Sequence, residues 1–93
     1  MKTIEHFQNG KSFSGDSKRL GKVFNPATGE QSAQVKLAST NDVNATVTKA
    51  KRAFEDWANT PPLQRSRIMF KFKELIEKNS DELTKIIVSE HGK

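Results

Sequence analysis

The last four residues, Glu90, His91, Gly92 and Lys93, place an acid, an imidazole, a glycine and an amine side by side. An acid beside an imidazole is the pairing that a general base and its orienting group require. Adjacent residues of a helix, however, point about 100° apart and do not face each other. We therefore interpret this stretch as the end of a helix, with Gly92 as its terminating glycine and a cation in the last turn that is favourable to the helix dipole.

The segment GKSFSGDS, residues 10–17, has the glycine spacing of a phosphate-binding P-loop. Asp16 stands where that loop carries its lysine, and a carboxylate there repels phosphate. The segment also lacks an apolar strand before it and a helix after it, and no G-x-G-x-x-G motif occurs in the chain. The sequence therefore argues against a nucleotide-binding loop.

Other reactive groups are scarce. The chain has no cysteine, so it has no thiol nucleophile, thiolate metal site or disulfide. Its two histidines, His6 and His91, lie at opposite ends and cannot start a local metal site. We expect no catalytic, cofactor-binding or metal-binding residue in this chain.

The net charge of +5 permits binding to phosphates but does not require it. Seven basic residues lie in the two longer predicted helices: Lys49, Lys51, Arg52, Arg65, Arg67, Lys71 and Lys73. They are able to follow a nucleic-acid backbone. Acidic partners three or four positions away, as in Lys71–Glu74, Lys73–Glu77 and Glu74–Lys78, are instead typical of a solvated helix face. A small basic helical module that binds nucleic acid or protein remains the alternative of a different class.

Residues 1–38 are predicted to form a β-hairpin segment. Asn9-Gly10 indicates a type I′ turn between TIEHF and KSF, because both central positions need a positive φ. Pro26 and Gly29 indicate a second turn, which leads into the alternating stretch SAQVKLAS. One face of that stretch carries Ala33, Val35 and Leu37. Two hairpins are the simplest account.

Residues 39–93 are predicted to form three amphipathic helices, the first running from about Asn41 to Ala58. Thr60 is expected to cap the second helix, with Pro61 at its first position. Asn79 is expected to cap the third, with Glu82 at the capping-box spacing. The three apolar stripes are Val43, Val47, Ala50, Phe54 and Trp57; Ile68, Met69, Phe72, Leu75 and Ile76; and Leu83, Ile86 and Ile87.

The whole chain is thus predicted to be an α+β unit with a modest core. Ninety-three residues suit one small domain, and only 33% of them are hydrophobic. No apolar run approaches the roughly 18 residues of a membrane span, and the first residues lack a signal-peptide core. We expect a cytoplasmic protein without a membrane anchor.

The order of these pieces resembles the amino-terminal end of the aldehyde dehydrogenase superfamily. The motifs that carry the resemblance are HFQNGK at residues 6–11, FNPATGE at 24–30, AFEDWANTPPLQRSRIMFKFKELIEKN at 53–79, and the final EHGK. The stretch TPPLQRSRIMFKFKELI, with SEHGK at the end, is similar to the CoA-acylating methylmalonate-semialdehyde dehydrogenases. The resemblance covers nearly the whole chain but only about the first fifth of such an enzyme.

This resemblance implies that the chain is a scaffold portion of a nucleotide-binding domain in an NAD-dependent parent enzyme. In the family a cysteine thiolate attacks the aldehyde, NAD accepts a hydride, and the thioester passes to coenzyme A to give propionyl-CoA or acetyl-CoA. The reactive residues lie later in the family's sequence, so this fragment is expected to be inactive and to bind neither cofactor. The resemblance implies the missing remainder of the enzyme as partner and a homo-oligomeric parent. A parent with another aldehyde specificity is the alternative within enzymes.

If the three helices close on one another, the chain can fold alone. If they do not, exposed apolar patches should drive association. We therefore expect the isolated chain to be a marginally stable monomer or an oligomer.

Overall fold

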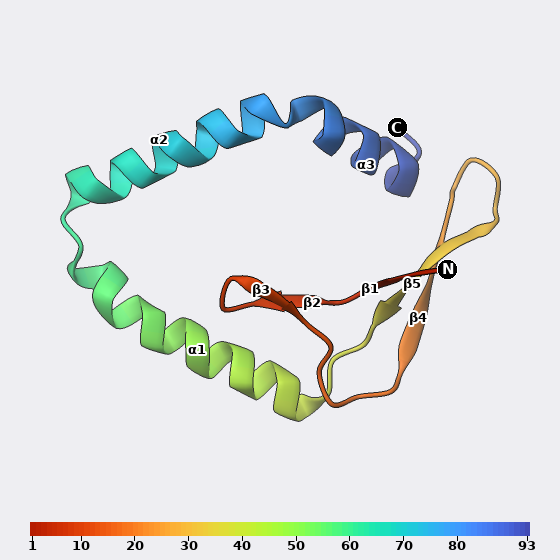
Figure 1. The fold of residues 1–93 in the computed structure, drawn as a ribbon, viewed down its shortest axis with the longest axis horizontal. Coiled ribbons are helices and arrows are strands. Elements are labelled where there is room, and N and C mark those ends of the chain that lie inside the picture. Colours follow the sequence, from red (N-terminus) through yellow and green to blue (C-terminus); the bar gives the residue numbers. More distant parts are fainter.

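The computed structural model describes all 93 residues and contains five strands followed by three helices, which confirms the α+β prediction (Figure 1). The elements are β1 (Lys2–Ile4), β2 (His6–Gln8), β3 (Lys11–Phe13), β4 (Leu20–Phe24), β5 (Gln31–Lys36), α1 (Thr40–Asn59), α2 (Pro62–Lys78) and α3 (Ser80–His91). None of the helices combines the length and the low polarity that crossing a lipid bilayer requires.

Strands β2 and β3 form the first predicted hairpin. They are antiparallel, with His6 opposite Phe13. Asn9 and Gly10 both have positive φ, 53° and 78°, which confirms the predicted turn geometry. The hairpin is shorter than expected, because the strand predicted from residue 3 is interrupted at Glu5.

The residues before that interruption, β1, pair with β5 instead of with the hairpin. The second predicted hairpin, β4–β5, is confirmed as an antiparallel pair, and β1 adds to β5 in parallel to complete a three-stranded sheet of order β1-β5-β4. Ala33 on the central strand β5 is the single buried hydrophobic residue of the chain. The parallel pairing was not predicted, because it joins segments about thirty positions apart that no turn connects.

The turn between β4 and β5 is held by its own polar groups. The Asn25 side chain accepts a hydrogen bond from the Ala27 amide at 2.9 Å, and the Gly29 amide donates to the Asn25 carbonyl at 2.8 Å. Gly29 has φ +76°, which confirms it as the left-handed residue of this turn.

Helix α1 is close to its predicted bounds, but the junction between α1 and α2 is not. Thr60 does not cap α2; it ends α1, and its hydroxyl donates to the Asp56 carbonyl at 2.9 Å. Pro61 takes the cap position without a side-chain hydrogen bond, and α2 begins at Pro62. With two prolines in succession, the second one occupies the first helical position, where the missing N–H costs nothing.

Asn79 occupies the predicted N-cap position of α3, but the predicted capping hydrogen bond does not form. Asn79 makes no side-chain cap; its amide group donates instead to the Leu75 carbonyl at 2.7 Å, back along α2. The backbone N–H of Asn79 donates to the same carbonyl, so the chain hardly leaves the helical path between α2 and α3. The other end of α3 agrees with the prediction, since Gly92 is left-handed (φ +82°) and its N–H donates to the Val88 carbonyl.

The elements enclose an open ring instead of a packed core (Figure 1). The Cα radius of gyration is 17.0 Å, whereas a compact domain of this length has about 12 Å. The three helices do not close on one another, and only Ala33 and Asp42 are buried. At the far end of α3, a Cβ added to Gly92 would lie 3.2 Å from Pro26, so the last helix meets the β4–β5 turn and completes the ring.

Candidate functional site

The densest polar cluster surrounds Asp42, in the first turn of α1. Its carboxylate accepts hydrogen bonds from the Ser39 amide at 3.1 Å and from the Asp16 amide at 3.2 and 3.3 Å. The Asp42 amide in turn donates to the Ser39 hydroxyl at 3.0 Å, which completes a reciprocal capping box. Asp42 thereby ties the loop before β4 to the beginning of α1.

These hydrogen bonds also favour the ionised form of the Asp42 carboxyl. The Ser39 amide is the largest cause of a lowered pKa for the Asp42 carboxyl, and the Asp16 amide, the Ser39 hydroxyl and the charge of His6 lower it further. Burial is the second-largest cause and raises the pKa, but the hydrogen bonds together outweigh it and the pKa is lowered. Asp42 is therefore an ionised acceptor already committed to two backbone amides, a structural role and not that of a free general base.

Gly15 allows this close approach. It has φ +75°, and a Cβ added there would lie 2.9 Å from the Asp42 Cγ atom. Both the left-handed backbone and the space occupied by the carboxylate therefore require glycine at this position.

His6 lies beside this cluster, in a shallow hollow between the β2–β3 hairpin and α1. Its ring stacks at a tilt on Phe13, with 5.4 Å between centroids, and its Nε2 atom is enclosed without a hydrogen-bond partner. The hollow measures about 310 Å³, and Val43 and Val47 of α1 also line it. Thr46 donates to the Gln8 side chain at 2.7 Å and fixes the hairpin to the same helix.

The segments singled out by their sequence have structural roles in this chain. In GKSFSGDS, the Asp16 amide donates to a carboxylate of the protein itself, so it is not free for a phosphate. Glu90 and His91 end α3, as the helix-end interpretation predicts. No group of three or more His, Cys, Asp or Glu side chains is placed to hold a metal ion.

The basic residues of α2 form part of a solvated face. Lys71 and Glu74 are 3.5 Å apart, Lys73 and Glu77 are 3.6 Å apart, and all four side chains are mainly exposed. Such exposed pairs contribute little to stability.

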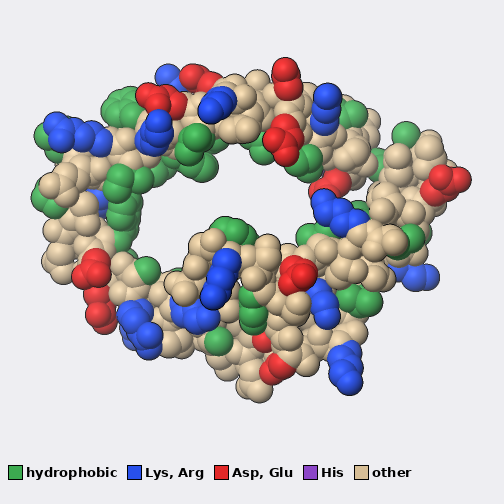
Figure 2. All heavy atoms as spheres, viewed as in Figure 1, with side chains coloured by type: hydrophobic (Ala, Val, Ile, Leu, Met, Phe, Trp, Pro, Cys, Tyr) green, Lys and Arg blue, Asp and Glu red, His purple; other side chains and the backbone are tan.

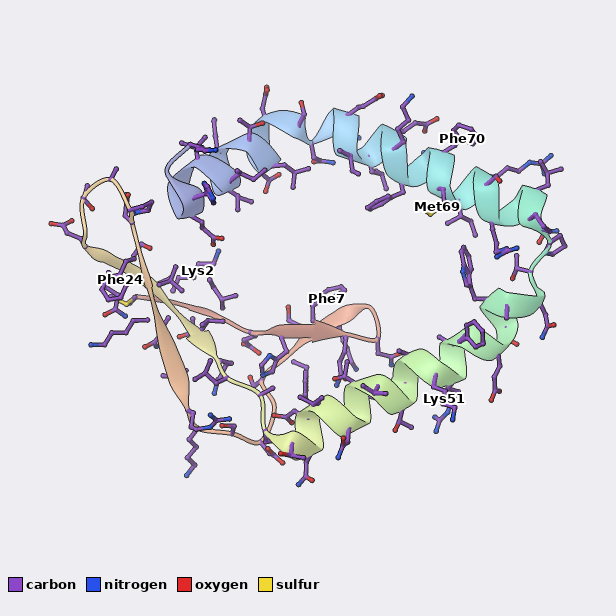
Figure 3. The ribbon with its side chains drawn as sticks, turned by 180° about the vertical axis from the view of Figure 1, so that it is seen from behind. Lys2, Phe7, Phe24, Lys51, Met69 and Phe70 are labelled. Carbon is purple, nitrogen blue, oxygen red and sulfur yellow. The ribbon has the colours of Figure 1, made fainter.

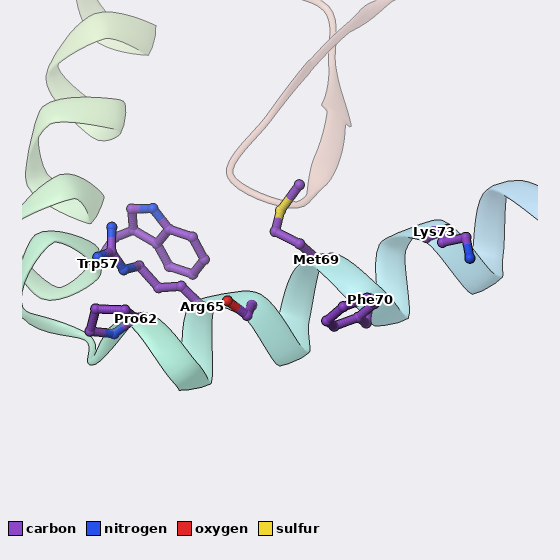
Figure 4. Close-up of a pocket in the computed structure, with 7 residues that line it drawn as sticks. Trp57, Pro62, Arg65, Met69, Phe70 and Lys73 are labelled. Carbon is purple, nitrogen blue, oxygen red and sulfur yellow. The ribbon is translucent and has the colours of Figure 1, made fainter.

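A second hollow, of about 570 Å³, lies where α1 meets α2 (Figure 4). Trp57 enters it from the end of α1, and Arg65 and Met69 enter it from α2. The Arg65 Nε atom is enclosed but has no hydrogen-bond partner. Figure 2 shows that hydrophobic side chains line much of the inner rim along the helices.

Sequence reasoning missed the Asp42 cluster. A signal for its helical half was present, because Ser39 and Asp42 have the S-x-x-D spacing of a capping box. The other half, the contact with Gly15 and Asp16, joins positions 26 residues apart and has no local signal.

The sequence model of the aldehyde dehydrogenase family matches residues 13–93. The chain belongs to the aldehyde dehydrogenase family. Among curated relatives, it is 40% identical over its whole length to a malonate-semialdehyde dehydrogenase of Pseudomonas aeruginosa and 37% identical to one of Oceanobacillus iheyensis. The predicted resemblance is therefore confirmed at the family level.

Solved structures show the same fold within longer chains. The chain matches the methylmalonate-semialdehyde dehydrogenase of Oceanimonas doudoroffii with a TM-score of 0.92 and 48% identity over 98% of its residues. It matches a structure from Sinorhizobium meliloti, described as a putative methylmalonate-semialdehyde dehydrogenase in complex with NAD, with a TM-score of 0.94 and 43% identity. The chain spans 18% of each of these two chains and 18–19% of the two curated relatives.

Proposed function

We propose that the chain is the amino-terminal scaffold of an NAD-dependent, CoA-acylating methylmalonate-semialdehyde or malonate-semialdehyde dehydrogenase. The observation that carries this proposal is the agreement of sequence and backbone along nearly the full chain, with 48% identity and a TM-score of 0.92 against one such enzyme. The proposed parent forms propionyl-CoA or acetyl-CoA from its semialdehyde substrate.

The chain's own residues fit a supporting role and not a chemical one. A thiol nucleophile is impossible without cysteine. The glycine-containing loop at Gly15 does not fit a cofactor phosphate, because the Asp42 carboxylate occupies the position that the Asp16 amide faces. We place the thiolate and the NAD and CoA sites in the rest of the parent, and we propose that this chain alone has no catalytic, cofactor-binding or metal-binding residue.

The proposal is tested with a chimaera in which residues 1–93 replace the matching segment of the Pseudomonas aeruginosa malonate-semialdehyde dehydrogenase. We expect aldehyde-dependent NAD reduction that requires CoA, and no activity from the 93-residue chain by itself. A chimaera that folds but lacks activity, or an active short chain free of longer protein, contradicts the proposal.

The alternative, a parent enzyme with another aldehyde specificity, is tested by assaying the natural gene product with different aldehydes, with and without CoA. The parent that we propose prefers malonate or methylmalonate semialdehyde and uses CoA as acyl acceptor. A parent that oxidises unrelated aldehydes to free acids supports the alternative.

The nucleic-acid alternative is tested by titrating labelled duplex and single-stranded nucleic acid into the chain at two salt concentrations. Binding tighter than about 1 μM with a steep salt dependence supports it. We expect neither, because Glu74 and Glu77 lie beside the basic residues of α2.

We propose that residues 1–38 and 39–93 act as a β-hairpin segment and a three-helix segment of one partial domain. We also propose that the parent is a cytoplasmic homo-oligomer, which cell fractionation and analytical ultracentrifugation of the natural gene product test.

A further inference from the structure

Asn9 and Gly10 form the tip of the β2–β3 hairpin, and both residues are exposed. The backbone nitrogen that follows an asparagine can close a five-membered ring with the carboxamide carbon of its side chain. Glycine in the second position favours this reaction, because it has no side chain to crowd the ring. No atom beyond the adjacent residues lies within 4 Å of the position that a Gly10 Cβ would take, so the ring has room to form.

The two groups that would react are not engaged in other interactions. The backbone bonds of the hairpin join β2 to β3, whereas the Gly10 N–H lies between the strands and donates no hydrogen bond. The Asn9 carboxamide also has no hydrogen-bond partner, in contrast to the asparagine side chains of the other turn and of the helix ends. Neither group therefore has to break a hydrogen bond before the reaction.

The asparagines at the helix ends are held in place. The Asn59 side chain donates to the Glu55 carbonyl at 2.8 Å, and the N–H of the next residue, Thr60, is bonded at the end of α1. The Asn79 side chain donates to the Leu75 carbonyl at 2.7 Å. Ring closure at either position must first break these bonds, which cost free energy to lose.

The remaining asparagines are excluded for other reasons. Asn25 precedes Pro26, whose backbone nitrogen carries no hydrogen and cannot form the ring. Asn41 and Asn44 lie within α1, where the N–H groups that follow them take part in the hydrogen bonds of the helix and its cap. Of six asparagines, only Asn9 therefore combines a following glycine, exposure and two unengaged groups.

We propose that Asn9 is a site of spontaneous covalent modification, which converts it to aspartate and isoaspartate. The Gly10 nitrogen bonds to the Asn9 Cγ atom and loses its proton, while the bond from Cγ to Nδ2 breaks and ammonia leaves. Water then opens the resulting cyclic imide. Addition of water at Cγ gives aspartate, and addition at the main-chain carbonyl carbon gives isoaspartate, in which the backbone runs through the former side chain. The sequence of steps needs no oxidant or reductant.

The two products affect the hairpin differently. An Asp-Gly pair suits the same type I′ turn as Asn-Gly. Isoaspartate instead adds a carbon atom to the backbone of a two-residue turn, so the pairing of Gln8 with Lys11 cannot keep its geometry. Phe7 points away from α1 into the opening of the ring (Figure 3), whereas the Gln8 side chain accepts a hydrogen bond from Thr46 of α1. Isoaspartate should therefore loosen the attachment of the hairpin to α1.

The site is tested by incubating the folded natural gene product at mildly alkaline pH and mapping its peptides by mass spectrometry at intervals. Both products show the mass gain of an amide converted to an acid, and methylation by a protein isoaspartyl methyltransferase identifies isoaspartate. We expect Asn9 to be modified about tenfold or more faster than Asn59 and Asn79, because the latter two must break hydrogen bonds first. Asn9→Gly is the matched control, because Gly-Gly suits the same turn but has no carboxamide.

Equal rates at Asn9, Asn59 and Asn79 in the folded protein, or the absence of isoaspartate at Asn9, overturn the assignment of this site. Its effect on the hairpin is measured by hydrogen exchange. In peptides that carry isoaspartate, amides of residues 6–13 should exchange about tenfold faster than in the Asn9→Gly protein. Freshly prepared Asn9→Asp should exchange like Asn9→Gly. Equal exchange in all three samples contradicts the predicted loosening of the hairpin.

Discussion

Replacing Gly15 by alanine should damage the junction between the sheet segment and α1. The new Cβ would lie 2.9 Å from the Asp42 Cγ atom, so the carboxylate must move away from the amides that it accepts. The backbone at Gly15 also has φ +75°, which disfavours any side chain.

Gly29→Ala is a matched control for the loss of stability expected in Gly15→Ala. Gly29 has φ +76°, but no atom lies within 4 Å of its would-be Cβ. The left-handed backbone costs about 1–2 kcal/mol in either alanine variant. Only Gly15→Ala also leaves the Asp16 N–H without its acceptor, and this loss costs about 1–3 kcal/mol more. The difference between the two variants should therefore be about 1–3 kcal/mol.

Hydrogen exchange followed by mass spectrometry in the folded chimaera measures this difference locally. Since about 1.4 kcal/mol corresponds to a factor of ten, amides of residues 39–43 should exchange about 5 to 150 times faster in Gly15→Ala than in Gly29→Ala. Equal exchange in the two variants, or faster exchange in Gly29→Ala, refutes the role assigned to the Asp42 cluster.

Three further predictions concern the same chimaera. Ser39→Ala should destabilise it by about 1 kcal/mol through loss of the α1 cap, whereas Asn79→Ala should cost less because the Asn79 side chain makes no capping hydrogen bond to α3; chemical denaturation compares them. The folded chain lowers the pKa of Asp42 below 3.8, so the stabilisation by its carboxylate is complete above that pH and is lost as the pH falls below it. Acid unfolding followed by circular dichroism should therefore be less steep in Asp42→Asn. A double-mutant cycle on Lys71 and Glu74 should give less than about 0.5 kcal/mol, and a larger coupling contradicts the solvated-face interpretation.

Local signals in the sequence were sufficient to predict most of the individual strands, turns and helices. Asn9-Gly10 and Gly29 define their turns through backbone conformations that few other residues adopt, and Gly92 ends α3 for the same reason. The cap at Thr60 was wrong, and Asn79 took its predicted position without the predicted capping bond, because several polar residues and prolines compete within a few positions. The choice among them depends on hydrogen bonds of only about 1 kcal/mol.

Long-range contacts could not be predicted in the same way. The parallel pairing of β1 with β5 and the bond from the Asp16 amide to Asp42 join distant positions, and their partners carry no local pattern. The helices that carry the apolar stripes were predicted correctly, but a stripe does not say what covers it. The sequence therefore identified apolar faces on α1 and α2 without showing that they line an open ring.

The attachment of α1 has a mechanical consequence. The hydrogen bonds that fix this helix to the strands lie near its first turns, at Asp42 and Thr46, while its other end at Asn59 carries α2 and α3. A helix of 20 residues is about 30 Å long, so a tilt of about 5° at its root displaces the tip by about 2.6 Å. A small distortion at Gly15 would therefore displace Trp57 and the helices after it by more than the length of a carbon–carbon bond.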